Sequence, residues 1–179
     1  MTDKVTAIEA HTPDFMEIGT AILQMLARTR HIDLKSSEAR HALIAMRRLP
    51  PHPDVLPALS RLRQAGYRLA TLSNSSEEGL EAQLDYAFLP EFFERRLSVE
   101  TPQLYKPHRD VYVWAAQQMS IVPSEGMLVA AHGWDVAGAK WAGWHTAFIA
   151  RAGQQIFPLA EHPDIDVAAF AALADALGA

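Results

Sequence analysis

The chain has 179 residues, of which 49% are hydrophobic and 21% are charged, a globular composition that excludes a disordered tail or a fibre. Its formal net charge is -5 and its lysines and arginines are spread thinly, which argues against a nucleic-acid partner. The absence of cysteine excludes disulfides, thiolate nucleophiles and cysteine-based zinc sites. The sequence has no long apolar stretch, and residues 1–10 lack the apolar core of a signal peptide. We therefore expect a cytoplasmic protein.

The first third of the chain has a helical pattern. Thr12 as N-cap and Pro13 in the first turn predict the start of one helix. Apolar residues continue it at spacings of three, four and seven, namely Phe15, Ile18, Ile22, Leu23, Met25 and Leu26. A second helix is expected over about residues 36–47. Three prolines within residues 50–53 then prevent a helix from continuing, so we predict one domain over residues 1–48 and a second over residues 49–179.

Beyond the prolines, predicted helices alternate with short apolar strands. Helices are expected at residues 54–65, 77–86, 109–119 and 166–177, and strands at residues 68–73, 96–99, 126–131 and 145–150. This alternation predicts an α/β fold with a doubly wound parallel sheet. Functional sites in such sheets lie at the carboxyl ends of the strands.

Three of the predicted strand ends or helix starts have polar residues. Ser73 and Asn74 end one strand, Lys106 and a proline precede a helix, and His132, Trp134 and Asp135 follow another strand. Each has a simpler interpretation taken singly, because Ser75 or Ser76 and Asp135 could be N-caps and lone lysines are usually solvated. A hydroxyl, an amide and a helix N-terminus after the first of these strands would also form an anion site.

In this order, the three motifs resemble motifs two, three and four of the haloacid dehalogenase superfamily. The resemblance is closest to its type II branch, the L-2-haloacid dehalogenases, and extends from about Phe15 to Ala150. It implies a Rossmann-like core over residues 49–179 and a small helical cap over residues 1–48.

The resemblance implies hydrolytic dehalogenation of small 2-haloalkanoic acids. In that family an aspartate attacks the carbon that bears the halogen, and water then hydrolyses the ester, with inversion at that carbon. A small carboxylate substrate is therefore expected, and no cofactor or metal is implied.

The resemblance also assigns roles to individual residues. Ser73 would hydrogen-bond the nucleophile or the substrate carboxylate, and Asn74 would help to hold the departing halide. Lys106 would keep the nucleophile ionised, while Asp135 would orient that lysine and assist the hydrolytic water. Trp134 and, from the cap, Phe15 would form apolar walls of the substrate pocket, although an aromatic on a helical stripe is more often ordinary core.

The first motif of the family, Asp-x-x-Gly-Thr at the end of the first strand, is absent. Asp14 with Gly19 and Thr20 has the wrong spacing and lies in a predicted helix, so we reject it as the nucleophile. We therefore expect a chain truncated at its N-terminus, inactive as written, with the first strand missing from the core. A homodimer is compatible with the resemblance, and the vacant sheet position favours association.

Two further departures concern the last motif. Magnesium-dependent phosphatases of the superfamily have Gly-Asp where this chain has Ala130 and Ala131, which disfavours phosphatase activity. The type II pattern has Ser-Asn where this chain has Ala131 and His132. His132 is thus expected close to the substrate, and we hypothesise that it acts as a base. A catalytically inactive relative that binds a small anion or a partner protein remains an alternative. The scattered histidines hardly support a zinc hydrolase.

Overall fold

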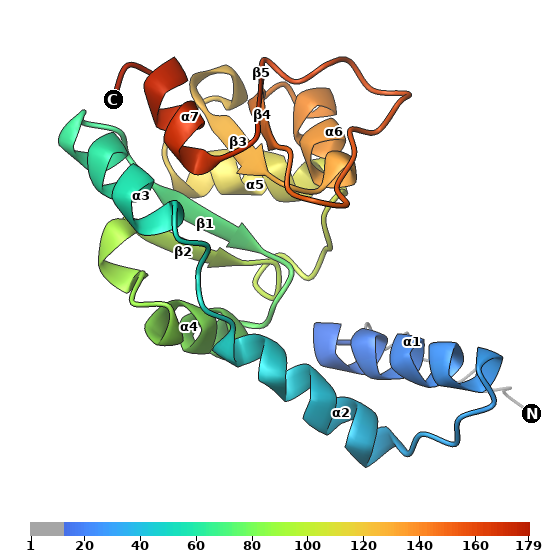
Figure 1. The fold of residues 1–179 in the computed structure, drawn as a ribbon. Helices are drawn as coiled ribbons and strands as arrows, with labels where there is room; N and C mark the ends of the chain where they lie inside the picture. Colours follow the sequence, from blue (N-terminus) through green and yellow to red (C-terminus); the bar gives the residue numbers. More distant parts are fainter. Residues whose placement is uncertain (1–12) are drawn as a thin grey trace, which may run out of the picture. The chain divides into compact units, whose positions relative to one another are not determined.

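The computed structural model describes residues 13–179 (Figure 1). Its contacts divide the chain into two compact units, Met1–Leu43 and Ile44–Ala179. The prolines predict the boundary slightly later, after Arg48. The 3-10 helix η1 (Ala45–Arg48) belongs to the second unit because it packs on helix α4 (Glu77–Tyr86), where Arg47 pairs with Glu78 at 2.7 Å. Within residues 13–179, no helix is long and apolar enough to cross a membrane.

The first unit contains helices α1 (Phe15–Thr29) and α2 (Ser36–Ile44). Asp14, rather than the predicted Thr12, caps α1, because its carboxylate accepts a hydrogen bond from the Glu17 backbone N–H at 2.7 Å. The Glu17 carboxylate accepts from the Asp14 N–H in return, which completes a capping box. Thr12 lies outside the described residues. Asp14 therefore has a structural role that accounts for its acidic side chain.

The second unit is an α/β layer structure in which every strand pair is parallel. A two-stranded sheet joins β1 and β2, and a three-stranded sheet has the order β3-β4-β5. These findings confirm the predicted α/β class. The strands are β1 (Ala70–Ser73), β2 (Arg95–Ser98), β3 (Met127–Ala130), β4 (His145–Ile149) and β5 (Ile165–Val167). The other helices are α3 (Val55–Gln64), α5 (Arg109–Gln118), α6 (Gly133–Trp141), α7 (Phe170–Ala176), η2 (Pro90–Phe92) and η3 (Pro123–Glu125).

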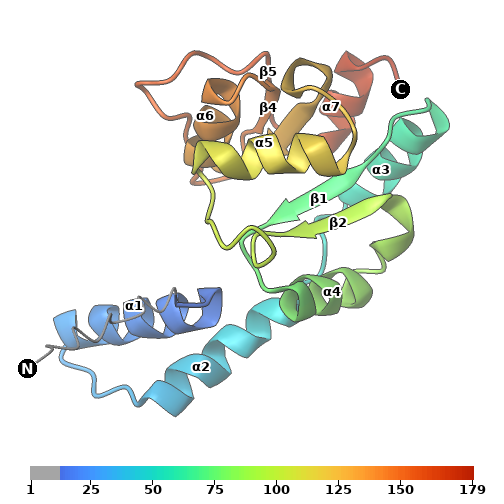
Figure 2. The ribbon, with the colours of Figure 1, turned by 180° about the vertical axis from the view of Figure 1, so that it is seen from behind.

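Helices cover the strands on both faces (Figures 1 and 2). On one face α3 packs against α7 through Ala58, Leu62 and Ala174, and Leu173 of α7 reaches β4. On the other face Tyr112 of α5 packs against Ala139 of α6. Burial of apolar side chains in these two layers supplies the main stabilisation of the unit.

The end of the chain differs from the prediction. Residues 166–177 are predicted as one helix, but Ile165–Val167 form β5, and α7 begins only at Phe170. The backbone N–H of Phe170 donates a hydrogen bond to the Asp54 carboxylate at 2.8 Å, which satisfies one free donor at the start of the helix. The helical spacing of apolar residues from Val167 onward is therefore misleading, because Val167 belongs to a strand and only the later residues belong to α7.

A tight backbone crossing lies at the start of α6. A Cβ atom added to Gly133 would lie 2.2 Å from the carbonyl oxygen of Gln155 and 2.7 Å from the backbone nitrogen of Phe157. The Phe157 ring also packs edge-on to Trp141 of α6, with the ring centroids 6.0 Å apart. The loop between β4 and β5 is therefore held closely against α6.

Candidate active site

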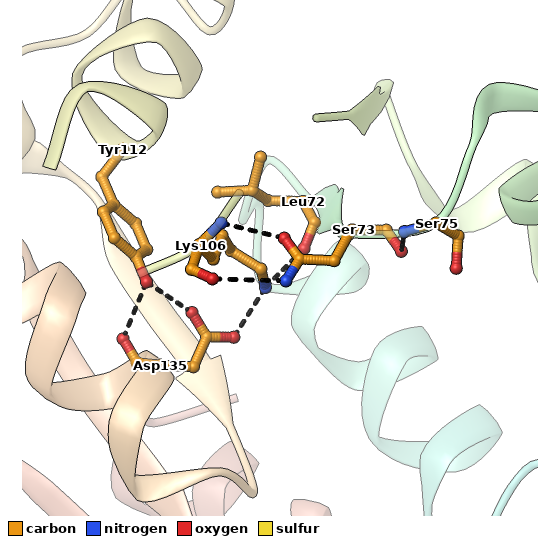
Figure 3. A network of polar contacts seen from close by, with 7 residues as sticks. Leu72, Ser73, Ser75, Lys106, Tyr112 and Asp135 are labelled. Carbon is orange, nitrogen blue, oxygen red and sulfur yellow. Dashed lines mark hydrogen bonds and ion pairs between the residues drawn. The ribbon is translucent and has the colours of Figure 1, made fainter. Parts of the chain in front are cut away.

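A buried ion pair joins two of the residues that the sequence singled out (Figure 3). Lys106 lies in the loop before α5, and Asp135 lies in the first turn of α6, after β3. The Lys106 Nζ is 2.6 Å from Asp135 Oδ2 and also donates to the backbone oxygen of Leu72 at 2.8 Å. The side chains of Lys106 and Asp135 are only 9% and 6% exposed. Asp135 is thus not an N-cap but the counter-ion of Lys106.

Tyr112 completes the network and was missed by sequence reasoning. This residue of α5 is fully buried, and its hydroxyl donates to Asp135 Oδ1 at 2.8 Å. Burial raises the pKa of Tyr112 above its ordinary value, and the neighbouring Asp135 carboxylate raises it further. Both carboxylate oxygens of Asp135 therefore have a donor, Lys106 on one side and Tyr112 on the other.

The close packing of α5 on α6 explains how Tyr112 reaches Asp135. A Cβ atom added to Gly138 would lie 2.8 Å from the Tyr112 hydroxyl and 2.7 Å from the Cβ of Pro107. A larger residue at position 138 would separate the two helices. A buried tyrosine usually has a partner for its hydroxyl, and here that partner is Asp135.

Asn74 holds the backbone of Lys106. Its side-chain oxygen accepts from the Lys106 backbone N–H at 3.0 Å, and its side-chain nitrogen donates to the Lys106 carbonyl at 3.4 Å. The amide therefore tethers the Lys106 loop to the end of β1 from both of its polar atoms. The predicted contact of Asn74 with halide stays a prediction.

The serines after β1 have local roles. The Ser73 hydroxyl oxygen accepts from the Ser75 backbone N–H at 3.1 Å, and Ser76 caps α4 by accepting from Gly79 N–H at 3.2 Å. The Glu77 N–H donates to Glu100 Oε2 at 2.8 Å. Part of the predicted anion site at this helix N-terminus is therefore filled by the protein's own groups. The catalytic role of Ser73 stays a prediction.

His132 and Trp134 lie together at the carboxyl end of β3. His132 is the N-cap residue of α6, although its side chain makes no capping hydrogen bond. The two rings have centroids 5.5 Å apart, and both side chains are exposed. Phe15 is the first residue of α1 in the other unit and is 37% exposed. Pocket roles for these three aromatic rings stay predictions.

The described residues 13–179 contain no group of three or more histidine or carboxylate side chains placed to hold a metal ion. The buried ion pair that the α/β unit holds near the carboxyl ends of β1 and β3 is that of Lys106 and Asp135. Such a pair can bind an anion through the ammonium and can orient water or a proton through the carboxylate.

The fold and the site define an α/β protein of the Rossmann-like class, with its charged residues at the carboxyl ends of parallel strands. Residues 4–143 match the haloacid dehalogenase-like hydrolase family, and the chain belongs to that family.

Individual relatives agree with this assignment. The chain is 30% identical over 162 residues to the (S)-2-haloacid dehalogenase of Pseudomonas sp. (strain YL). This match covers 90% of this chain and 70% of that protein. It is 35% identical over 149 residues to the (S)-2-haloacid dehalogenase of Xanthobacter autotrophicus, covering 83% of this chain and 58% of the relative. The match therefore spans between 58% and 70% of the length of these two relatives.

A solved structure shows the same fold. The L-2-haloacid dehalogenase of Xanthobacter autotrophicus, with chloropropionic acid covalently bound, superposes with a TM-score of 0.85 at 26% identity. The superposition covers 93% of this chain and 76% of that one. The prediction of a haloacid dehalogenase-like Rossmannoid core is thereby confirmed.

Proposed function

We propose that the site serves the hydrolytic dehalogenation of small 2-haloalkanoic acids. The observation that carries the proposal is the buried Lys106–Asp135 pair at the carboxyl ends of β1 and β3, with Asn74 fixing the Lys106 loop. The names of the relatives, (S)-2-haloacid dehalogenases, support this substrate class and the (S) configuration.

The reaction has two steps. A carboxylate oxygen attacks C2 of the substrate while the carbon–halogen bond breaks, and halide leaves with the bonding electrons. Water then cleaves the resulting ester, which releases the 2-hydroxy acid with inverted configuration and one proton. Lys106 would stabilise the attacking carboxylate by its charge, and Asp135 would orient both Lys106 and the hydrolytic water.

The attacking carboxylate must be a group other than Asp135. Both oxygens of Asp135 already accept hydrogen bonds from Lys106 and Tyr112. Within residues 13–179, Asp135 is the only carboxylate that forms an ion pair with Lys106. We therefore assign to this chain the binding and positioning of the substrate, and expect halide release only where a nucleophilic carboxylate stands beside Lys106.

Substrate binding to the 179-residue chain tests the proposal. We expect (S)-2-chloropropionate to shift the NMR signals of Ser73, Asn74 and Lys106, and we expect its neutral amide to leave them unchanged. Lys106→Met should abolish this binding, whereas the matched variant Lys140→Met, in the Lys140–Asp164 pair on the far end of α6, should retain it. Absence of binding to the chain would overturn the proposal.

A phosphatase assay on the same sample separates the two chemistries of the superfamily. Ala130 and Ala131 stand where a magnesium-dependent site needs a carboxylate, so we expect no magnesium-dependent release of phosphate from p-nitrophenyl phosphate. Release of phosphate at an enzymatic rate would contradict the dehalogenase proposal. The homodimer predicted from the sequence is checked by light scattering of the same sample.

A further inference from the structure

A buried serine ties the loop after β1 to the end of the neighbouring strand. Ser98 is the last residue of β2 and lies opposite Ser73 of β1 in the parallel register. Ser98 is only 2% exposed. Its hydroxyl donates to the Ser75 carbonyl at 2.7 Å and accepts from the Glu100 backbone N–H at 3.1 Å. One hydroxyl group therefore joins the two loops that follow β1 and β2.

The contacts of the first loop hold the backbone on both sides of Asn74. The Ser73 carbonyl, in the peptide unit before Asn74, accepts from the Val99 N–H at 2.9 Å. The Ser75 N–H, in the peptide unit after Asn74, donates to the Ser73 hydroxyl at 3.1 Å. Ser98 then holds the Ser75 carbonyl. Because peptide units are planar, holding those on either side of a residue also fixes the direction of its side chain.

The direction of the Asn74 side chain decides where Lys106 lies. The Asn74 amide accepts from the Lys106 backbone N–H at 3.0 Å and donates to the Lys106 carbonyl at 3.4 Å. The ammonium of Lys106 in turn forms the 2.6 Å ion pair with Asp135 (Figure 3). The contacts that begin at Ser98 therefore end at the buried ion pair of the site.

A second tie between the two loops lies at the surface. The Glu77 N–H donates to the Glu100 carboxylate at 2.8 Å, and the Thr101 hydroxyl donates to the Glu77 carboxylate at 2.9 Å. All three residues are exposed, so water can replace these hydrogen bonds at little cost. Ser98 is buried, so a loop that loses its hydroxyl must shift to satisfy the Ser75 carbonyl.

We propose that Ser98 is a positioning residue of the site, which holds the loop after β1 so that Asn74 keeps Lys106 against Asp135. In this role the Ser98 hydroxyl makes and breaks no covalent bond. The effect on Lys106 rests on the contacts alone. Only the consequence for substrate affinity rests on the proposed function.

Hydrogen exchange at the Lys106 backbone N–H tests the proposal in the 179-residue chain without a substrate. Asn74 accepts this N–H, so exchange requires their contact to open. The reference is Ala115, a buried residue of α5. We expect Ser98→Ala to raise the ratio of the Lys106 rate to the Ala115 rate by about tenfold. An unchanged ratio would overturn the inference.

Ser76→Ala is the matched control. It makes the same change in the same loop and removes the cap of α4, in which the Ser76 hydroxyl accepts from the Gly79 N–H at 3.2 Å. It leaves the Ser98 hydroxyl bonded to Ser75, so we expect the exchange ratio to stay within about twofold of the parent value. Equal rises in the two variants would mean that general loss of loop stability controls Lys106, and would overturn the inference.

Conservative variants separate positioning from packing. Ser98→Thr keeps a hydroxyl and should retain the parent exchange ratio. Ser98→Cys is close to serine in size but is a weak hydrogen-bond donor, so it should raise the ratio. A rise in Ser98→Thr as large as that in Ser98→Cys would assign the effect to packing and overturn the inference. This comparison also decides the question if Ser98→Ala fails to fold.

A double variant tests whether Ser98 acts through Asn74. Asn74→Ala removes the acceptor of the Lys106 N–H and should by itself raise the exchange ratio by about tenfold. Adding Ser98→Ala to Asn74→Ala should then change the ratio by less than about twofold, because the contact through which Ser98 acts is already lost. Two independent effects that multiply would overturn the inference.

Substrate binding separates this inference from the proposed function. We expect Ser98→Ala to weaken the binding of (S)-2-chloropropionate by about threefold or more, and Ser76→Ala to leave it unchanged. Faster exchange at Lys106 in Ser98→Ala, without any binding of (S)-2-chloropropionate to the parent chain, would support the positioning role and count against the proposed function. Normal binding with unchanged exchange in Ser98→Ala would do the reverse.

Discussion

The α/β unit contains two lysine–aspartate pairs of the same length in different surroundings. Lys106 with Asp135 and Lys140 with Asp164 both have an Nζ–Oδ distance of 2.6 Å. The first pair is less than a tenth exposed on both side chains, whereas Asp164 in the second is 34% exposed. Distance alone therefore does not distinguish a site from a surface contact.

The partners around each pair explain the difference. Asp135 also binds the Tyr112 hydroxyl, and Lys106 also binds the Leu72 carbonyl, so removal of one member strands a charge in a dry environment. Asp164 also has a donor on each oxygen, Lys140 on Oδ1 and the Thr146 backbone N–H on Oδ2, but its side chain is 34% exposed and so stays partly solvated. The hydrogen bond from Lys140 and that from Thr146 lower the pKa of Asp164, and burial opposes them. Loss of one member should therefore cost much more stability in the buried Lys106–Asp135 pair than in the half-buried Lys140–Asp164 pair.

The largest effect is expected from truncating the two lysines in turn. Lys106→Met should lower the free energy of unfolding by about 3–5 kcal/mol because Asp135 stays buried without its counter-ion. Lys140→Met should lower it by less than about 1 kcal/mol. Urea unfolding followed by circular dichroism measures both. Adding Asp135→Leu to Lys106→Met removes the stranded charge and should recover part of the loss. Equal losses for the two single variants would show that burial does not distinguish the two pairs.

Removal of the Tyr112 hydroxyl should have the next largest effect. Tyr112→Phe leaves one oxygen of Asp135 without a donor and should cost about 1.5–3 kcal/mol, the range for hydrogen bonds to charged groups. The control is Tyr86→Phe on the exposed side of α4, with an expected change below about 0.5 kcal/mol. Similar losses in the two variants would show that Asp135 does not depend on Tyr112.

A third pair, Arg151 with Asp54, tests the role of pH. Burial disfavours the charged form of Asp54, but hydrogen bonds from Arg151 and from the Phe170 N–H outweigh it, and the pKa of Asp54 lies below its usual 3.8. This contribution to stability is present above 3.8 and is lost as the pH falls through the lower native value. Asp54→Asn should cost about 1–2 kcal/mol at neutral pH and progressively less under acid conditions.

Thermal unfolding at a series of pH values measures the Asp54 effect. Asp85→Asn, an exposed position on α4, is the control and should change stability little at any pH. A penalty for Asp54→Asn that stays constant down to strongly acid pH would contradict the assignment of this stability to the ionised carboxylate.

The smallest expected effect is that of salt. Screening reaches the half-buried Lys140–Asp164 pair more than the buried one, so molar sodium chloride should erase most of the stability difference between Lys140→Met and the parent chain. The difference for Lys106→Met should remain. Equal salt sensitivity would mean that water reaches both pairs alike.

Sequence reasoning placed Lys106 and Asp135 together only through the family resemblance, in which Asp135 orients that lysine. It could not identify Tyr112, since a tyrosine inside a helix has the pattern of ordinary core, and only the close approach of α5 and α6 at Gly138 reveals its partner. It predicted helix at Asp166 and Val167, which belong to β5, because an edge strand of three residues is too short to show alternation. It proposed Thr12 as the cap because Pro13 follows it, although aspartate suits that position as well as threonine does.

The family resemblance supplied the roles of the residues, but not their contacts. Asn74, expected at the halide, binds both backbone groups of Lys106. Which polar atoms a side chain satisfies depends on the path of a loop more than thirty positions away in sequence. Neither motif order nor propensity contains that information.

Gly133 limits how this protein can change in evolution or in the laboratory. The carbonyl of Gln155 occupies the space where any other residue would place its first side-chain carbon. A saturation library at position 133 should therefore return glycine alone among folded clones, unless a deletion in the β4–β5 loop accompanies the change. Insertions that remodel this loop and substitutions at the turn between β3 and α6 should therefore occur together. His132 and Trp134 can vary only if the backbone of Gly133, which lies between them, keeps its position.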